Sequence, residues 1–287
     1  THLAARMEQL AAPGGILHIL NHAIFKCLLF YAAGTVYRAT HTVDVERLGG
    51  LMRVVPWTAG FFLIGGLAMA GLPGLNGFTS EFLILAAALD PSTSSGLERV
   101  GLVGAGAALA LVGGAAAFAV VRAFGITFLG TPRDPAVTNH GEPSLPMRVA
   151  MGLHVAAAVA IGLAPELGLR AVAATAGLFR ALVPGSVVEP AHALIGPSRL
   201  VSLFVLALAA LWGARWLLAR RAPAPATPPQ PTWGCGFPSP SARMQYTGAS
   251  FAAPLVQLVE GVLPQLKRAQ LPAGFFPGHG DHLSTHS

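Results

Sequence analysis

The stretch from Pro56 to Leu89 limits what this chain can fold into more than any other part of it. The stretch is apolar over 34 residues and contains one charged residue, Glu81. A transmembrane helix needs about 20 apolar residues, so the stretch is too long for one straight crossing. Because proline and glycine both interrupt helices, it predicts two half-helices separated by a break. The break is predicted at Pro73, Gly74, Asn76 and Gly77.

The composition of the chain is typical of a membrane protein. Of its 287 residues, 53% are hydrophobic and 10% are charged, and the mean hydropathy is +0.61. Soluble domains carry about 25% charged residues. We therefore predict an all-α integral membrane protein, a multi-helix bundle with one discontinuous transmembrane helix. The net charge of +6 does not indicate nucleic-acid binding, because the arginines lie at the ends of apolar runs.

The apolar runs predict about five crossings in a transmembrane domain over residues 14–221. The run 171–183 is too short to span and is expected to lie in the interface or to re-enter. Residues 1–13 are a lead-in of mixed polarity, and we expect that an N-terminal part is missing because the chain does not begin with methionine. The predicted crossings are 14–37, 56–89 (broken), 99–130, 148–164 and 199–218.

The region after the last crossing is expected to lie outside the membrane core. Residues 222–248 are predicted to be a proline-rich cytoplasmic linker, residues 249–270 an amphipathic interfacial helix, and residues 271–287 a disordered tail. If the crossings alternate, the side with loop 38–55 carries eleven of the 18 lysines and arginines, and the other side carries five. The positive-inside rule then makes loop 38–55 and the C-terminus cytoplasmic.

Three basic residues follow one another at helical spacing in the first crossing. His18, His22 and Lys26 are spaced i, i+4 and i+8 and so share one helix face. Lys26 is about 17 Å from either end of its helix, beyond the reach of a snorkelling side chain. Histidine and a buried lysine both exchange protons near neutral pH. The pattern predicts a proton relay, with a packing network of hydrogen bonds as the alternative.

Glu81 is the predicted partner of Lys26, because each is the charge at the middle of its crossing. The pair is expected to act as a switch that moves a proton when it opens; the alternative is a static ion pair that fastens two helices. Arg122 lies within the third crossing. It cannot lose its proton, so it either anchors the helix by snorkelling or tunes the local field.

No motif for covalent or redox chemistry occurs in the sequence. There is no phosphate-binding loop with its lysine, no nucleophile elbow and no iron–sulphur cysteine set. Cys27 and Cys235 are too far apart for a zinc motif. We expect no catalytic residue, no metal site and no cofactor in this chain. Whether the protein is a subunit of an enzyme complex therefore depends on its partners.

Three sequence runs resemble the antiporter-like proton-translocating family. They are His18–Phe30, Glu46–Leu51 and Leu72–Leu83. The family includes the large membrane-arm subunits of respiratory complex I, Mrp antiporter subunits and membrane subunits of energy-converting hydrogenases. The later runs Thr232–Phe237 and Arg243–Phe251 are similar to the hydrogenase-4 component B branch, also called formate hydrogenlyase subunit 3-like.

The resemblance implies specific roles for the intramembrane residues. Such proteins contain two inverted repeats, each with a discontinuous helix, and this chain would hold the end of the second repeat and the helices after it. Lys26 matches the central-axis lysine of the family, and His18 and His22 match the histidines that precede it. Glu81 matches the charged residue on the second discontinuous helix. The entry half of the pathway, in the first repeat, would lie outside this sequence.

The function implied by the resemblance is that of a proton-translocating subunit of a redox-driven complex in the bacterial inner membrane. Its partners would be other membrane subunits of a hydrogenase or complex I-like assembly, the lipid bilayer, and protons or Na⁺ as the transported ion. The alternatives are an Mrp-type cation/proton antiporter subunit and a structural membrane anchor.

Overall fold

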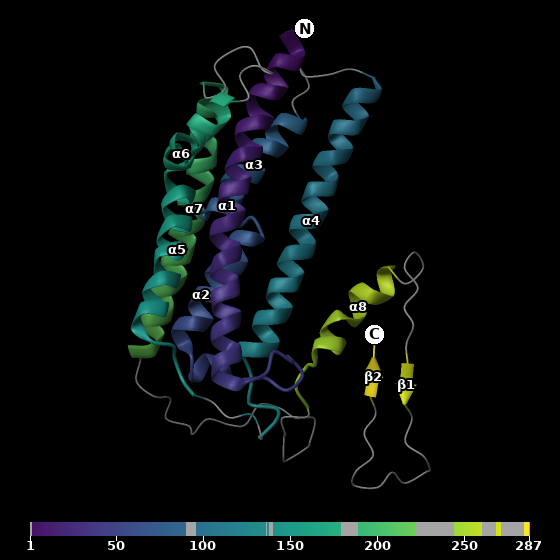
Figure 1. Ribbon diagram of the computed structural model, residues 1–287, viewed down its shortest axis with the longest axis vertical. Helices are drawn as coiled ribbons and strands as arrows, with labels where there is room; N and C mark the ends of the chain where they lie inside the picture. Colours follow the sequence, from purple (N-terminus) through teal and green to yellow (C-terminus); the bar gives the residue numbers. More distant parts are fainter. Residues whose placement is uncertain are drawn as a thin grey trace. The chain divides into compact units, whose positions relative to one another are not determined.

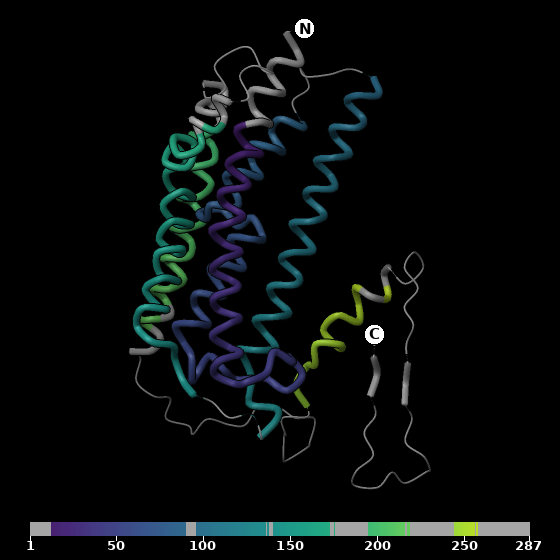
Figure 2. Tube along the Cα trace, viewed as in Figure 1, coloured from purple at the N-terminus to yellow at the C-terminus, as the bar shows by residue number. Residues whose placement is uncertain are grey.

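The structure is a computed structural model, and it describes residues 2–89, 96–135, 137, 140–178, 189–221, 244–259, 268–270 and 284–286. It divides into two units, Thr1–Gln245 and Tyr246–Ser287. The first unit is a bundle of long helices that run side by side, with the purple helix α1 in their midst (Figures 1 and 2). Most of the predicted linker, residues 222–243, lies outside the described part of the chain.

The helices of the first unit confirm the predicted all-α fold. Four described segments are long and apolar enough to cross a membrane: Pro13–Thr40, Leu97–Phe128, Leu145–Leu163 and Ile195–Arg215. Two shorter apolar helices, α2 and α3, follow one another over the predicted broken crossing. The elements are α1 (His2–Thr40), a short 3₁₀ helix (Leu51–Arg53), α2 (Pro56–Met69), α3 (Asn76–Leu89), α4 (Leu97–Phe128), α5 (Leu145–Leu163), α6 (Pro165–Leu178) and α7 (Glu189–Arg221).

The structure differs from the prediction at the start of α1 and in the segment that forms α6. Helix α1 begins at His2 and not near residue 14, with Pro13 inside it, because residues 3–11 are rich in alanine, leucine and other strong helix formers. Helix α6 follows α5 after a break at Ala164, which precedes a proline and therefore leaves the helical region. Its Leu169 and Val172 are buried against Leu17 of α1. This part of the run 171–183 is therefore packed in the bundle, and residues 179–183 lie outside the described part.

The break between α2 and α3 is a glycine-terminated helix end. Gly71 has a left-handed backbone, with φ +67°. Its N–H bonds to the carbonyl of Ala68 at 3.2 Å, and the N–H of Leu72 bonds to the carbonyl of Leu67 at 3.0 Å. This is the Schellman pattern, which satisfies the last carbonyl groups of a helix. The discontinuity therefore spans residues 70–75, while the predicted break residues Asn76 and Gly77 form the first turn of α3.

Neighbouring helices hold the backbone of the break. The N–H of Gly74 donates to Ser202 Oγ of α7 at 3.0 Å. Asn21 of α1 donates from Nδ2 to the carbonyl of Asn76 at 2.7 Å. Gly162 of α5 lies so close that a Cβ there would collide with the carbonyl oxygen of Gly74. Because lipid offers no hydrogen bonds, broken helices are tolerated only where protein or water supplies them.

The core of the bundle follows one side of α1. Its buried residues fall into apolar clusters spaced along that helix, each shared with other helices. Leu17 packs with Leu83, Ile161, Leu169, Val172 and Ile195, Phe25 with Ala68 and Leu75, Leu28 and Ala32 with Met151, and Val36 and Ala39 with Leu48, Leu51, Val55, Ala59 and Phe128.

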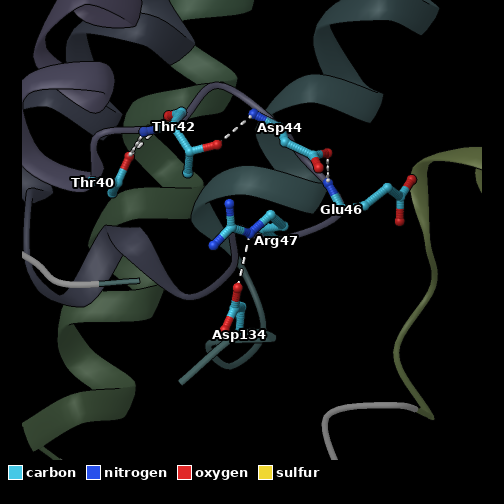
Figure 3. Close-up of polar contacts among 6 residues, drawn as sticks. All are labelled: Thr40, Thr42, Asp44, Glu46, Arg47 and Asp134. Carbon is cyan, nitrogen blue, oxygen red and sulfur yellow. Dashed lines mark hydrogen bonds and ion pairs between the residues drawn. The ribbon is translucent and has the colours of Figure 1, made fainter. Parts of the chain in front are cut away.

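The loops after α1 and α4 are bound to each other at one end of the bundle. In the loop after α1, Asp44 Oδ1 accepts a hydrogen bond from the N–H of Glu46, and Arg47 forms an ion pair of 2.8 Å with Asp134 (Figure 3). Arg133 donates to the carbonyl groups of Leu48 and Ile126. The two loops therefore form one cross-linked surface.

A carboxylate from the loop before α5 caps the start of α2. Glu142 Oε1 accepts a hydrogen bond from the N–H of Trp57 at 2.6 Å, and its Oε2 accepts one from Thr58 Oγ1 at 2.9 Å. Arg38, in the last turn of α1, donates to the carbonyl of Glu142 at 3.0 Å. An acidic side chain at a helix N-terminus pairs with free N–H groups and with the positive end of the helix dipole.

The second unit contains one helix and a pair of short strands. Helix α8 (Gly248–Val259) begins with a reciprocal cap in which Thr247 and Ser250 each bond the other's backbone N–H. Strand β1 (Arg268–Gln270) pairs antiparallel with β2 (Ser284–His286). The predicted amphipathic helix 249–270 is thus helical only to Val259 and extended at 268–270, with 260–267 outside the described residues; residues 284–286 of the predicted disordered tail form a strand.

We expect the substitution Gly71→Ala to destabilise the protein. A left-handed backbone costs a non-glycine residue about 1–2 kcal/mol, and a Cβ at this position would also collide with the carboxylate of Glu81. Gly60→Ala in α2 is the matched control, because a Cβ there meets nothing within 4 Å. Thermal unfolding of the purified protein in detergent should show a lower Tm for Gly71→Ala alone; equal Tm values would contradict the assignment of the break.

We expect Gly162→Ala to loosen the contact between α5 and the break. Overpacking a close backbone contact costs about 1–3 kcal/mol, and the new methyl group would meet the carbonyl of Gly74. The control is Gly152→Ala on the same helix, where a Cβ meets nothing within 4 Å. The free energy of unfolding in mixed detergent micelles should fall for Gly162→Ala only, and an equal effect of both substitutions would show that the contact is loose.

Candidate functional site

A hydrogen-bonded cluster joins α1 to the first turns of α3. His18 Nδ1 shares a hydrogen bond with Ser80 Oγ at 3.1 Å. Asn21 donates from Nδ2 both to Ser80 Oγ at 3.1 Å and to the carbonyl of Asn76. Asn76 in turn donates from Nδ2 to Asn21 Oδ1 at 3.3 Å. Each of these bonds connects the central helix to the half-helix that follows the break.

The cluster belongs to a polar layer that lies between two apolar clusters of the bundle. On α1, Asn21 lies between Leu17 of one cluster and Phe25 of another. Burying a polar side chain is unfavourable unless it is hydrogen-bonded, so such a layer specifies one packing of its helices. Its six residues are at most 2% exposed. They are Asn21 of α1, Asn76, Thr79 and Ser80 of α3, and Ser198 and Ser202 of α7.

Most of this layer was missed by sequence reasoning. Asn21 could have predicted part of the layer. It is a polar residue within an apolar run, three positions after His18, and residues three apart on a helix are neighbours. Ser80 was overlooked because it precedes the more conspicuous Glu81. Serine is common in helices of membrane proteins, so the burial of Ser198 and Ser202 depends on packing that no short sequence pattern reports.

The three basic residues of α1 extend from the polar layer along the helix. The ring centroids of His18 and His22 are 6.2 Å apart, and His22 also lies edge-on to Phe25 at 5.3 Å. His22 is exposed, whereas His18 and Lys26 are partly buried. His18 therefore faces α3 through Ser80, and His22 lies toward a side of α1 that the described helices leave uncovered.

The expected ion pair between Lys26 and Glu81 is not formed. Ion pairs in the described part of the chain join Arg47 to Asp134 and Arg199 to Glu166, and neither Lys26 nor Glu81 takes part in them. On α3 it is Ser80 that faces α1, and successive residues on an α-helix point about 100° apart. The carboxylate of Glu81 instead lies beside Gly71 in the break and 3.9 Å from the position of a Cβ on Gly113 of α4.

Arg122 lies on α4 and is partly buried. It is six residues before Phe128, the last residue of the helix. Helix α4 packs on α2 and α3. A permanent positive charge at this position is close enough to the helix end for its side chain to reach the interface. The structure therefore leaves both roles predicted for Arg122 open.

An ion pair between α6 and α7 lies beside the polar layer. Glu166, in the first turn of α6, forms an ion pair with Arg199 of α7. Sequence reasoning missed it because Pro165 and Glu166 look like a loop after a helix, and because Arg199 looks like a residue that ends a membrane span. A pattern of a proline followed by an acidic residue also fits a helix N-terminus, which is what the structure contains.

Among the described residues, no three histidine, cysteine, aspartate or glutamate side chains lie close enough together to bind a metal ion. The histidines after residue 270, apart from His286, lie outside the described part of the chain. The geometry places the imidazole of His18 against the hydroxyl of Ser80, two groups that can each donate or accept a hydrogen bond.

The chain is similar to known membrane proteins over most of its length. It is 35% identical over 294 residues to hydrogenase-4 component B of Escherichia coli (strain K12), covering 92% of this chain and 43% of that protein. It is 31% identical over 271 residues to formate hydrogenlyase subunit 3 of the same strain, covering 94% and 43%. The chain thus spans less than half the length of these relatives.

A solved structure shares the fold. It is that of the membrane-bound sulfane sulfur reductase, an archaeal respiratory membrane complex, which matches with a TM-score of 0.62 and 22% identity over 88% of this chain and 40% of that chain. The profile of the NADH:quinone oxidoreductase/Mrp antiporter transmembrane family matches residues 2–101, which include α1, the break and α3. Residues 2–101 are thus similar to the NADH:quinone oxidoreductase/Mrp antiporter transmembrane family, and most of the chain is similar to part of hydrogenase-4 component B and of formate hydrogenlyase subunit 3.

Proposed function

We propose that this chain is part of a proton-translocating subunit of a redox-driven membrane complex. The observation that carries the proposal is the direct bonding of His18 to Ser80, next to the helix break. It connects the basic residues of α1 to the helix that carries Glu81. The family match over residues 2–101 supports the same conclusion. The complex would lie in the bacterial inner membrane with other membrane subunits, and the redox centres would lie in those partners.

The geometry suggests how a proton would pass between α1 and α3. Lys26 and His22 would deliver it to His18 along one face of α1, since the rings of the two histidines are one turn apart. The Ser80 hydroxyl, which bonds His18 and precedes Glu81 in the chain, would relay it across to α3. Glu81 would then hold the proton beside Gly71 and α4. No direct contact between Lys26 and Glu81 is needed.

The orientation of the subunit follows from its charges. The loop after α1 and the loop after α4 carry Arg47 and Arg133 and are bound to each other, and positive residues collect on the cytoplasmic side. This side would be cytoplasmic, and so would the C-terminus. Arg122 would then anchor α4 at the same interface. Protons would leave toward the other end of the bundle.

We expect Lys26→Ala to abolish proton translocation while electron transfer continues. A positioned proton-transfer group contributes about 10²-fold or more to the rate of its step, so the rate of proton uptake should fall by roughly that factor. The measurement is acidification of inside-out vesicles that contain the full-length protein in its complex, with electron-donor turnover recorded in parallel. Cys27→Ala, at the adjacent exposed position, is the control. Unimpaired translocation in a correctly assembled Lys26→Ala complex would refute the relay.

We expect Glu81→Gln to uncouple the same complex. Glutamine keeps the size and polarity of glutamate but cannot hold an exchangeable proton at that carboxyl, so translocation should fall while assembly is preserved. Glu98→Gln, an exposed carboxylate in the first turn of α4, is the control. If both variants translocate protons equally well, Glu81 is not on the pathway. Sodium-dependent proton exchange without any electron donor would instead indicate an antiporter.

A further inference from the structure

Buried polar atoms without a partner gather around the polar layer. Seven buried side-chain nitrogen or oxygen atoms in the described part of the chain have no hydrogen-bond partner. Two of these, Nε of Arg133 and Nε of Arg148, lie elsewhere. The other five are Asn76 Oδ1, Thr79 Oγ1, Glu166 Oε2, Ser198 Oγ and Arg199 Nε. Because a buried polar atom that is left unsatisfied destabilises the fold, five in one region indicate a site for a polar ligand.

The helix geometry brings these atoms to one side of the break. Gly74 is flanked by Gly162 of α5 and by Ser202 of α7, which binds its N–H. Glu166 lies in the first turn of α6, just after α5 ends, and Arg199 lies three residues, or about one helical turn, before Ser202 on α7. The two side chains meet there in an ion pair. Thr79 lies one turn beyond the break on α3.

The Glu166–Arg199 ion pair is buried on one side and exposed on the other. Glu166 Oε2 and Arg199 Nε are buried and without a partner. Yet the side chains of Arg199 and Glu166 keep 42% and 27% of their surface exposed. The pair is therefore accessible from outside the bundle on one side and buried on the other. A side chain that passes protons between the inside of the helix bundle and its surface must be accessible from both.

We propose that the polar layer holds a chain of ordered water molecules which joins the α2–α3 break to the Glu166–Arg199 pair, and that Glu166 exchanges protons with this chain. Water is the ligand that fits, because the unpartnered atoms include both donors and acceptors, and buried waters usually bond two to four such atoms. Apolar clusters around Leu17 and Phe25 confine the layer on both sides.

The proton step balances without a co-reactant. An adjacent water breaks one O–H bond and gives its proton to Glu166 Oε2, which forms a new O–H bond and becomes neutral. That water takes a proton from the next one, and the last water, at the break, takes its proton from the neutral carboxyl group of Glu81, which becomes a carboxylate; the waters themselves are unchanged. Neutral Glu166 holds Arg199 less strongly, and release of the proton to the exposed side restores the ion pair. Arg199 stays charged throughout.

The first test asks whether the water is there. A high-resolution cryo-electron microscopy map of the full-length protein in its complex should contain ordered waters within hydrogen-bond distance of Asn76 Oδ1, Thr79 Oγ1 and Ser198 Oγ. A map in which these atoms instead pair with protein side chains, or in which no water contacts them, would overturn the proposal. This measurement does not depend on activity.

The second test uses Glu166→Gln in the vesicle assay. Glutamine still accepts a hydrogen bond from Arg199 but cannot exchange the proton, so we expect a fall of about tenfold or more in proton translocation, with unchanged electron transfer and Tm. Glu166→Asp should restore part of the rate. Asp134→Asn, in the other ion pair, is the matched control and should behave as the unmodified complex. Wild-type translocation by Glu166→Gln would overturn the proposal.

This inference rests on the proposed proton-translocating function, and Lys26→Ala in the same assay separates the two. If Lys26→Ala stops translocation and Glu166→Gln does not, the proposed function stands and the role of Glu166 is refuted. If neither variant changes translocation, both are refuted. If both stop it and Glu166→Asp partly restores it, Glu166 acts through its proton and not only through the packing of α6 on α7.

Discussion

The structure depends on satisfying the backbone of a helix that stops inside the bundle. A free N–H or carbonyl group in lipid costs several kcal/mol, so the break between α2 and α3 exists only because other groups bind it. Gly71 closes the end of α2, Ser202 accepts from the N–H of Gly74, and Asn21 donates to the carbonyl of Asn76. The polar layer that any proton pathway would use is thus the same one that stabilises the fold.

The placement of Glu81 means that no ion pair with Lys26 connects α1 to α3. A direct pair with Lys26 would tie α1 to α3 by Coulomb attraction alone, and its strength would depend on a poorly known dielectric constant. The structure joins these helices through hydrogen bonds instead, in which Ser80 Oγ is bonded both to His18 and to Asn21. Hydroxyl and amide groups can each donate and accept, so they transmit a change in protonation without needing two buried charges to meet.

Much of the fold was predictable from sequence, because hydrophobic run length and proline–glycine pairs report directly on crossings and breaks. The discontinuous helix and the basic face of α1 are examples. That Glu81 does not meet Lys26 was not predictable: whether residue 80 or residue 81 faces α1 depends on the rotation of α3, a matter of one residue in a helix whose first turns are polar on more than one side. The Glu166–Arg199 pair was not predicted for a related reason: a proline after a helix usually marks a loop.

The capping of α2 by Glu142 has a mechanical consequence. The start of α2 is bound to the segment that leads from α4 into α5, and Arg38 ties the end of α1 to the same residue. Pulling α2 along its axis would therefore strain α1, α4 and α5 at once. The start of α3 is held by other helices, because Asn21 of α1 binds the carbonyl of Asn76 and Ser202 of α7 binds the N–H of Gly74; α2 is therefore fixed at its capped start and α3 at the break itself.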